Sequence, residues 1–209
     1  MNYPKLKSLL EAVLAGKNDF LFDHILSQIH CMSRPRVYGV INAIVSSMEA
    51  GELYLEVGTY QGGSLISALL GNEANAIGVD SFQEFQTTNN FEQTLNNLVK
   101  FGVVNRVSLK NMSYQEFFAD VPTDFRIQVY YYDGEHNYEG QLAGMEAGWP
   151  FLSPGSIIIV DDFLYPEVNR AVNQFIANHI DRVKILIAMD SMNDVDPVWW
   201  NGVLALRVL

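Results

Sequence analysis

The sequence predicts an α/β protein with a mostly parallel β-sheet, helices on both faces and an antiparallel last strand. From residue 53 onward, strand-like segments alternate with helix-like segments, which is the pattern of consecutive βα units. The strand-like segments are apolar at most positions, as is typical of parallel strands buried on both faces. Only a loop separates the last two strands, and it is too short for a parallel crossover. The final strand should therefore run antiparallel.

The expected elements follow one another in a regular order. Seven strands are predicted, at 53–58, 76–80, 107–111, 127–133, 156–162, 183–189 and 202–208. Helices are predicted between the first six of them, at 64–70, 90–101, 113–118, 140–149 and 166–179.

The first 50 residues predict helices that precede the first strand. Apolar residues recur there at helical spacing, namely Leu6, Leu9, Leu10, Val13 and Leu14. A break is expected around Gly16–Asp19, and a further helix over 38–49, ending near Gly51. We interpret residues 1–50 as a helical cap that belongs to the same domain as residues 51–209.

Composition narrows the class of protein. The chain has 209 residues and a formal net charge of −11, from 13 basic and 24 acidic residues, so its surface should repel nucleic acid. Its single cysteine, Cys31, excludes an internal disulfide. No signal peptide and no membrane-spanning apolar run is visible. We expect a cytoplasmic protein, without nucleic-acid or membrane partners, that acts on a neutral or cationic small molecule, and a homodimer is a reasonable assembly.

The first strand ends in the glycine-rich stretch "LEVGTYQGGS". Gly58, Gly62 and Gly63 allow positive φ or close approach of another backbone, and Glu56 and Ser64 flank them. A tight turn without a ligand is the alternative interpretation. The spacing does not fit G-x-G-x-x-G, which argues against a dinucleotide site and favours a nucleoside ligand without a pyrophosphate.

Polar residues also follow the second and third strands. Asp80, in "GVDSF", lies where a carboxylate can accept hydrogen bonds from both hydroxyls of a ribose, or it caps the next helix. After the third strand, Met112 offers an apolar wall and Ser113 a polar contact for a base. Ser113 with Glu116 also fits a capping box, so both interpretations of Ser113 stay open.

Two further apolar strands end in carboxylates. "VYYYDGEHNY" delivers Asp133, Glu135 and His136, and "SIIIVDDF" delivers Asp161 and Asp162. Ligands of open α/β sheets bind beyond the carboxyl ends of the strands, so these residues are candidates for a site. Helix capping by Asp161 or Asp162 is the alternative.

Together the stretches "YLEVGTYQGGS", "GVDSF", "YYYDGEHNYEG" and "SPGSIIIVDDF" resemble the motifs of class I S-adenosylmethionine-dependent methyltransferases. More narrowly, residues 50–209 resemble metal-dependent small-molecule O-methyltransferases of the macrolide- and aminocoumarin-sugar and cephalosporin-pathway type. The resemblance implies a Rossmann-like seven-stranded sheet. It also implies a set of residues that bind S-adenosylmethionine, namely Glu56, Gly58, Thr59, Gly62, Gly63, Ser64, Asp80, Ser81, Met112 and Ser113.

The resemblance also gives the strand-end carboxylates a role. Asp133, Asp161 and Asp162 would repel one another unless a cation lies between them, and a hard divalent ion such as Mg²⁺ prefers oxygen ligands. His136 stands where related catechol-type enzymes carry a lysine base, so it would accept the proton of a substrate hydroxyl, with Asp133 as the alternative base. The expected reaction is methyl transfer to a hydroxyl oxygen. A non-catalytic S-adenosylmethionine-binding protein and an NAD-dependent oxidoreductase are the alternatives.

One long loop, "MDSMNDVDPVWW" at 189–200, could overhang the strand ends. Its Trp199 and Trp200 either line a substrate pocket or begin the last hairpin, and we favour the hairpin.

Overall fold

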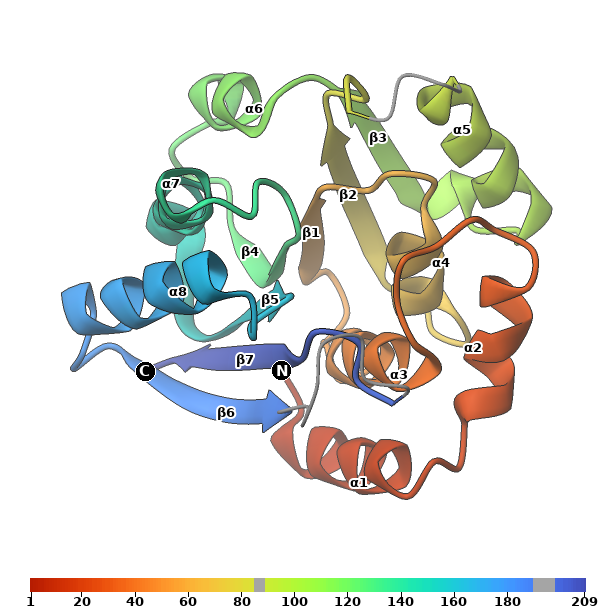
Figure 1. Ribbon diagram of the computed structural model, residues 1–209, viewed down its shortest axis with the longest axis horizontal. Coiled ribbons are helices and arrows are strands. Elements are labelled where there is room, and N and C mark those ends of the chain that lie inside the picture. Colours follow the sequence, from red (N-terminus) through yellow and green to blue (C-terminus); the bar gives the residue numbers. More distant parts are fainter. Residues whose placement is uncertain (85–88, 190–197) are drawn as a thin grey trace.

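A computed structural model describes residues 1–84, 89–189 and 198–209 of the chain (Figure 1). Within these residues, the strands form one sheet in the order β3-β2-β1-β4-β5-β7-β6. The strands are β1 (Leu53–Val57), β2 (Asn75–Asp80), β3 (Val107–Asn111), β4 (Ile127–Tyr132), β5 (Leu152–Asp161), β6 (Val183–Met189) and β7 (Val203–Val208).

Helices connect the strands, as predicted. They are α1 (Tyr3–Leu14), α2 (Asp19–Leu26), α3 (Pro35–Val45), α4 (Gly63–Leu69), α5 (Asn90–Lys100), α6 (Tyr114–Asp120), α7 (Tyr138–Gly148) and α8 (Pro166–Asn178), with 3₁₀ turns η1 (Val104–Arg106) and η2 (Trp149–Phe151). Three predicted boundaries are wrong by three residues or more, the first being the end of helix α3, which lies at Val45 rather than at Glu49. Helix α3 begins at Pro35 rather than Tyr38, because proline suits the first turn of a helix. Strand β5 begins at Leu152, which pairs with Ile127 before the register shifts.

The predicted sheet is confirmed, including its antiparallel end. Strands β1 to β5 pair in parallel, whereas β7 lies antiparallel between β5 and β6. Only an antiparallel strand can be inserted there without a second helical crossover. The arrangement brings the carboxyl ends of β1, β2, β4 and β5 to one edge of the sheet (Figure 1).

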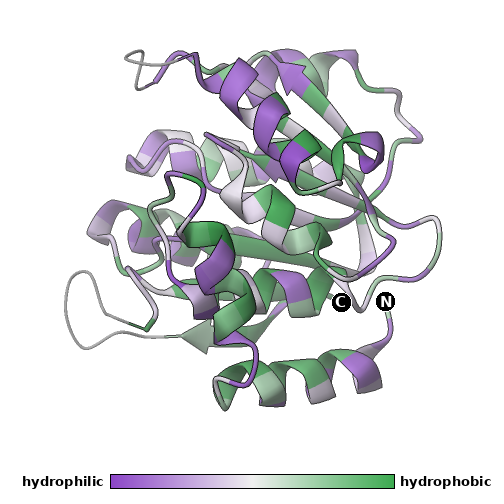
Figure 2. Cartoon of the chain, turned by 90° about the vertical axis from the view of Figure 1, so that its right-hand side faces the viewer, coloured by the Kyte–Doolittle hydropathy of each residue, from purple (hydrophilic) through white to green (hydrophobic). Residues whose placement is uncertain are grey.

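Strand β4 shows how the sheet separates two hydrophobic clusters. Because successive side chains of a strand point to opposite faces, Tyr131 packs with the cluster of α1 to α4, whereas Tyr130 and Tyr132 pack with that of α6 to α8. The N-terminal helices share the first cluster with the sheet. In Figure 2 the central strands are mostly green, while α1 at the bottom alternates green with purple. In the part of the chain that is described, no helix is long and apolar enough to cross a membrane.

Candidate active site at the carboxyl ends of the strands

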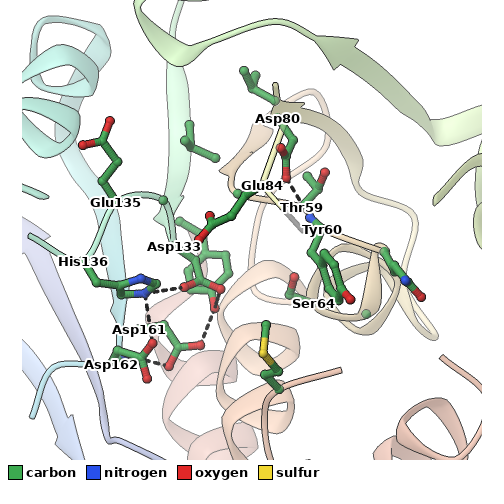
Figure 3. A pocket seen from close by; sticks show the side chains of 18 of the residues that line it. Thr59, Tyr60, Ser64, Asp80, Glu84, Asp133, Glu135, His136, Asp161 and Asp162 are labelled. Atoms are coloured by element: carbon green, nitrogen blue, oxygen red, sulfur yellow. Dashed lines mark hydrogen bonds and ion pairs between the residues drawn. The ribbon is translucent and has the colours of Figure 1, made fainter. Parts of the chain in front are cut away.

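A cavity of about 480 Å³ lies at the carboxyl ends of the strands (Figure 3). It brings together most of the residues singled out from the sequence. Those that line it are Gly58, Thr59, Gly63, Ser64, Asp80, Ser81, Met112, Ser113, Asp133, His136, Asp161 and Asp162. The two other predicted residues, Glu56 and Gly62, are not among the lining residues.

The turn after β1 needs glycine for space as well as for conformation. Gly58 has a φ of 87°, and a Cβ atom there would collide with the carbonyl oxygen of Asp133. At Gly63 a Cβ atom would collide with Sγ of Cys31 and lie 2.6 Å from the hydroxyl of Tyr38. The glycines therefore keep the first βα turn in close contact with β4 and with the segment before α3.

Glu56 supports this turn from beneath. Its side chain is fully buried and accepts hydrogen bonds from Oη of Tyr54 at 2.5 Å and from Oγ of Ser64 at 2.8 Å. Burial raises the pKa of Glu56 to about 8, although the two hydrogen bonds act in the opposite direction. Glu56 therefore holds the turn through Ser64 and does not itself line the cavity.

Asp80 joins two loops at the edge of the cavity. Its carboxylate accepts hydrogen bonds from the backbone amides of Tyr60 at 2.8 Å and Phe82 at 2.7 Å. Burial raises the pKa of Asp80, and these amides lower it in part. The N-cap of the following helix α5 is Asn89, so the alternative of Asp80 as its cap is wrong.

Ser113 confirms its predicted capping role, and its contact with a base stays a prediction. It is the N-cap of α6 and forms a capping box with Glu116, and it also lines the cavity. The residue is therefore held in place by the helix that it begins.

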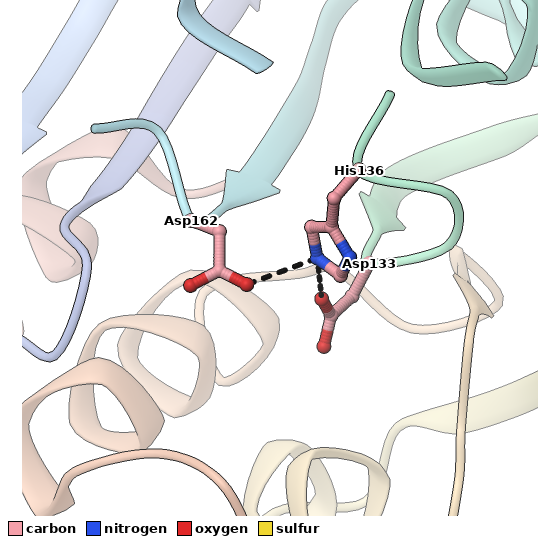
Figure 4. A group of neighbouring side chains, drawn as sticks. All are labelled: Asp133, His136 and Asp162. Atoms are coloured by element: carbon pink, nitrogen blue, oxygen red, sulfur yellow. Dashed lines mark ion pairs between the residues drawn. The ribbon is translucent and has the colours of Figure 1, made fainter. Parts of the chain in front are cut away.

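Asp133, His136 and Asp162 form a compact charged group (Figure 4). Nε2 of His136 lies 3.3 Å from Oδ1 of Asp133 and 2.9 Å from Oδ2 of Asp162. Hydrogen bonds to these two carboxylates raise the pKa of His136 to about 11, against a smaller opposing effect of burial. In this arrangement the imidazolium itself is the cation between the carboxylates. One ligand atom from each residue lies within 4.8 Å of the others, which is close enough to share a metal ion.

Asp161 is turned toward the interior rather than toward His136. Its Oδ2 accepts a hydrogen bond from the hydroxyl of the buried Tyr131 at 2.6 Å, and its Oδ1 accepts one from the amide of Asp162 at 2.9 Å. The same hydroxyl lies 3.3 Å from Oδ2 of Asp133. Burial and the neighbouring carboxylates raise the pKa of Asp161 well above its usual value. Helix α8 has Tyr165 as its N-cap, so neither Asp161 nor Asp162 caps it.

Backbone strain is concentrated at the cavity. Among the described residues, four that are not glycine have positive φ, and all four line it: Tyr60, Phe82, Asp162 and Trp200. Such conformations cost about 1–3 kcal/mol each and persist where surrounding contacts hold them. The strain is therefore a property of this site rather than of the fold at large.

The sequence motifs did not indicate several of the residues that line the cavity. Tyr131 could have been found, because strand alternation places it on the same face as Asp133. Tyr165 and the segment 30–33 come from loops without a recognisable pattern. Trp200 lines the cavity, contrary to the interpretation that we favoured, whereas Trp199 packs with the first hydrophobic cluster. The rest of that loop, residues 190–197, lies outside the described residues.

The fold is Rossmann-like, and its cavity lies beyond the carboxyl ends of the strands, where proteins with open α/β sheets bind their ligands. The family described as "Methyltransferase domain" matches residues 55–163, which is more than half of the chain. The chain therefore belongs to this methyltransferase family.

Individual relatives are distant. An uncharacterized protein of Acanthamoeba polyphaga mimivirus is 27% identical over 152 residues, which are 68% of this chain and 67% of the viral protein. The O-methyltransferase TomG of Streptomyces achromogenes, solved with SAM, has a TM-score of 0.65 at 16% identity, covering 85% of this chain and 81% of TomG. An O-methyltransferase of Bacillus cereus, solved with SAH, has a TM-score of 0.62 at 13% identity, covering 99% and 91%. These similarities establish a shared methyltransferase fold.

Proposed function

We propose that the protein transfers a methyl group from S-adenosylmethionine to a hydroxyl oxygen of a small molecule, with the help of a divalent cation. The observation that carries the proposal is one cavity that joins the glycine turn to the group Asp133, His136 and Asp162. Structures of similar fold were solved with SAM or SAH, and two of them are named as O-methyltransferases. This similarity supports the choice of cofactor and of oxygen as the acceptor atom.

The lining residues fit a nucleoside cofactor. The turn after β1 forms part of the cavity wall through Gly58, Gly63 and Ser64, where its backbone would face the cofactor. Asp80 would accept from ribose hydroxyls, since each carboxylate oxygen can accept more than the one amide bond it has here. Ser81, Met112 and Ser113 would surround the base. When bound, S-adenosylmethionine supplies a methyl group activated by its sulfonium.

Nε2 of His136 is the atom that we propose to take the proton of the acceptor hydroxyl. A base must be unprotonated, and the two carboxylates now hold His136 in its charged form. A divalent cation on the same carboxylates would offset their charge and bring the pKa of His136 back toward its usual value. Asp133, which borders the same space, is the alternative base.

Asp133, Asp161 and Asp162 are the residues that would hold the cation. Their donor set consists of oxygens, which suits Mg²⁺. Asp161 can keep its hydrogen bond from Tyr131 and still bind an ion, because a carboxylate oxygen has two lone pairs. A cation bound there would lower the pKa of a substrate hydroxyl.

The charge of the cavity selects the class of acceptor. Six acidic residues line it, namely Asp80, Glu84, Asp133, Glu135, Asp161 and Asp162. No lysine or arginine is among the described lining residues. A carboxylate or phosphate on the acceptor would be repelled. The rings of Tyr165 and Trp200 offer an apolar wall. We therefore propose a neutral or cationic acceptor with adjacent oxygens, such as a diol or catechol.

The test is transfer of a labelled methyl group from S-adenosylmethionine to a panel of neutral and cationic diols and catechols. We expect labelled ether with Mg²⁺ and a large loss in EDTA, and a loss of about 10²–10⁴-fold in His136→Gln with unchanged binding of S-adenosylhomocysteine. Undiminished turnover in EDTA would overturn the role of the cation. Cofactor binding without transfer to any acceptor would favour a non-catalytic binding protein. The expected homodimer stays a prediction.

A further inference from the structure

Asn201 brings a hydrogen-bond donor to the charged group from a part of the chain without a recognisable motif. Its Nδ2 donates to Oδ1 of Asp162 at 2.7 Å, across 39 positions of the sequence. The other carboxylate oxygen of Asp162, Oδ2, lies 2.9 Å from Nε2 of His136 (Figure 4). Asp162 is therefore held at both oxygens, by a neutral amide at one and by the imidazole at the other.

The backbone that carries Asn201 is attached to the turn that follows Asp162. The carbonyl oxygen of Asn201 accepts a hydrogen bond from the amide of Leu164 at 2.9 Å. The carbonyl oxygen of Gly202 accepts one from the amide of Phe163 at 3.4 Å. The donor and the carboxylate therefore lie on two segments that their backbones already hold together.

The preceding residue, Trp200, attaches the same segment to the N-terminal helices. Cζ of Arg34, the N-cap residue of α3, lies 4.4 Å from the centre of the Trp200 ring. Trp200 has a φ of 57°, a strained conformation that persists where surrounding contacts hold it. Both Trp200 and Asn201 line the cavity. The segment 200–202 is thus fixed by α3 as well as by the turn between β5 and α8.

Asp162 needs such support because its own backbone is strained. Its φ of 52° lies in the left-handed region, which is uncommon for residues other than glycine. A cation at Oδ2 would take the place of the contact with His136, whereas the amide of Asn201 could stay on Oδ1. A neutral amide orients the carboxylate without cancelling its charge, as a lysine or arginine would, so the charge remains available to a cation.

We infer that Asn201 is a positioning residue, whose amide fixes the carboxylate of Asp162 so that Oδ2 faces the space shared with Asp133 and His136. The inference rests on the proposed function, in which Asp162 helps to hold the cation. Asn201 takes no part in the chemistry of transfer. A carboxylate that is already oriented loses less conformational freedom when a cation binds, so the cation is bound more tightly.

The test is a calorimetric titration of the full chain with Mn²⁺ and, separately, with S-adenosylhomocysteine. Asn201→Ala removes the donor, and Asn201→Leu removes it while keeping a side chain of similar size. Each variant should raise the Kd for Mn²⁺ about tenfold and change that for S-adenosylhomocysteine less than twofold.

Asn72→Ala is the matched control. Asn72 is also half-buried, and its Nδ2 donates to the carbonyl oxygen of Ala68 at 2.8 Å, away from the cavity wall. Asn72→Ala should lower the Tm about as much as Asn201→Ala does, because each loses one amide donor, but it should change neither Kd.

Three results would overturn the inference. The Kd for Mn²⁺ could be unchanged in Asn201→Ala and Asn201→Leu, it could rise equally in Asn72→Ala, or it could rise only together with the Kd for S-adenosylhomocysteine. The last two results would show a general loosening of the fold. A wild-type chain that binds S-adenosylhomocysteine but not Mn²⁺ would instead overturn the proposed role of the cation.

Discussion

Single residues set the charge of this site. His136 lies between Asp133 and Asp162, and Tyr131 lies between Asp133 and Asp161, so two donors hold together three carboxylates that would otherwise repel one another. The side chain of Tyr131 is fully buried. Tyr131 therefore packs in the first hydrophobic cluster and also brings its hydroxyl to the carboxylates, which predicts a positioning role.

Tyr131→Phe should weaken binding of Mn²⁺ or Mg²⁺ about tenfold, because Asp161 loses the hydrogen bond that orients it. Tyr130→Phe is the matched control, since its hydroxyl donates to the carbonyl of Gly144 on the opposite face of the sheet. Each variant should lose about 1 kcal/mol of stability. Cation titrations followed by calorimetry provide the comparison, and equal affinities in the two variants would contradict a positioning role.

Glu56 should make the protein less stable as the pH rises. The pKa of Glu56 is about 8 in the folded protein, whereas its ordinary value, which we take for the unfolded chain, is 4.5. The stability that Glu56 contributes is therefore complete below pH 4.5 and is lost as the pH rises toward 8. The limiting slope is about 1.4 kcal/mol per pH unit.

Glu56→Gln keeps an acceptor for Tyr54 and Ser64 but has no charge to bury. Urea unfolding of the variant between pH 5 and pH 8 should therefore show a smaller decline than the wild type. Parallel declines in the two proteins would show that Glu56 is not the group responsible.

At the scale of elements, the strand ends and the turns between them build the site. Each βα turn of β1, β2 and β5 contains a residue with positive φ that lines the cavity, namely Tyr60, Phe82 and Asp162. The turn at Gly58 is the tightest, because it touches the backbone at the end of β4. Its position thus links the glycine turn to the loop that carries Asp133.

Gly58→Ala should destabilise the fold more than Gly71→Ala. Both glycines have positive φ, but a Cβ atom at Gly71 would meet nothing within 4 Å, whereas one at Gly58 would collide with Asp133. The strain alone costs about 1 kcal/mol, which is the loss expected for Gly71→Ala. Urea unfolding measures the difference. If the two losses are the same, the close approach at Gly58 has no energetic weight.

At the scale of the whole molecule, local patterns predicted the elements, and their order along the chain predicted the parallel sheet. The spatial order of the strands required the structure, because no local signal tells whether β7 pairs on one side or is inserted between β5 and β6. The residues of the site likewise fall into those that local patterns predict and those that only the folded structure reveals. Residues at strand ends could be predicted from their motifs, whereas Ser33, Tyr165 and Trp200 reach the cavity from loops that only the folded chain brings near.

The orientation of the side chains at the site could not be predicted from the sequence either. A carboxylate pair at 161–162 predicts a charged strand end, but not that Asp161 turns toward Tyr131 while Asp162 meets His136. Those directions depend on the positive φ of Asp162 and on the hydroxyl of a residue in the neighbouring strand. Both are consequences of packing rather than of local propensity.

A calorimetric titration of the full chain with S-adenosylhomocysteine, with NADH in parallel, tests the central claim most directly. The glycine turn, the position of Asp80 and the cavity predict one S-adenosylhomocysteine bound per chain and no heat from NADH. Binding of NADH without S-adenosylhomocysteine, or of neither ligand to the folded chain, would contradict the account.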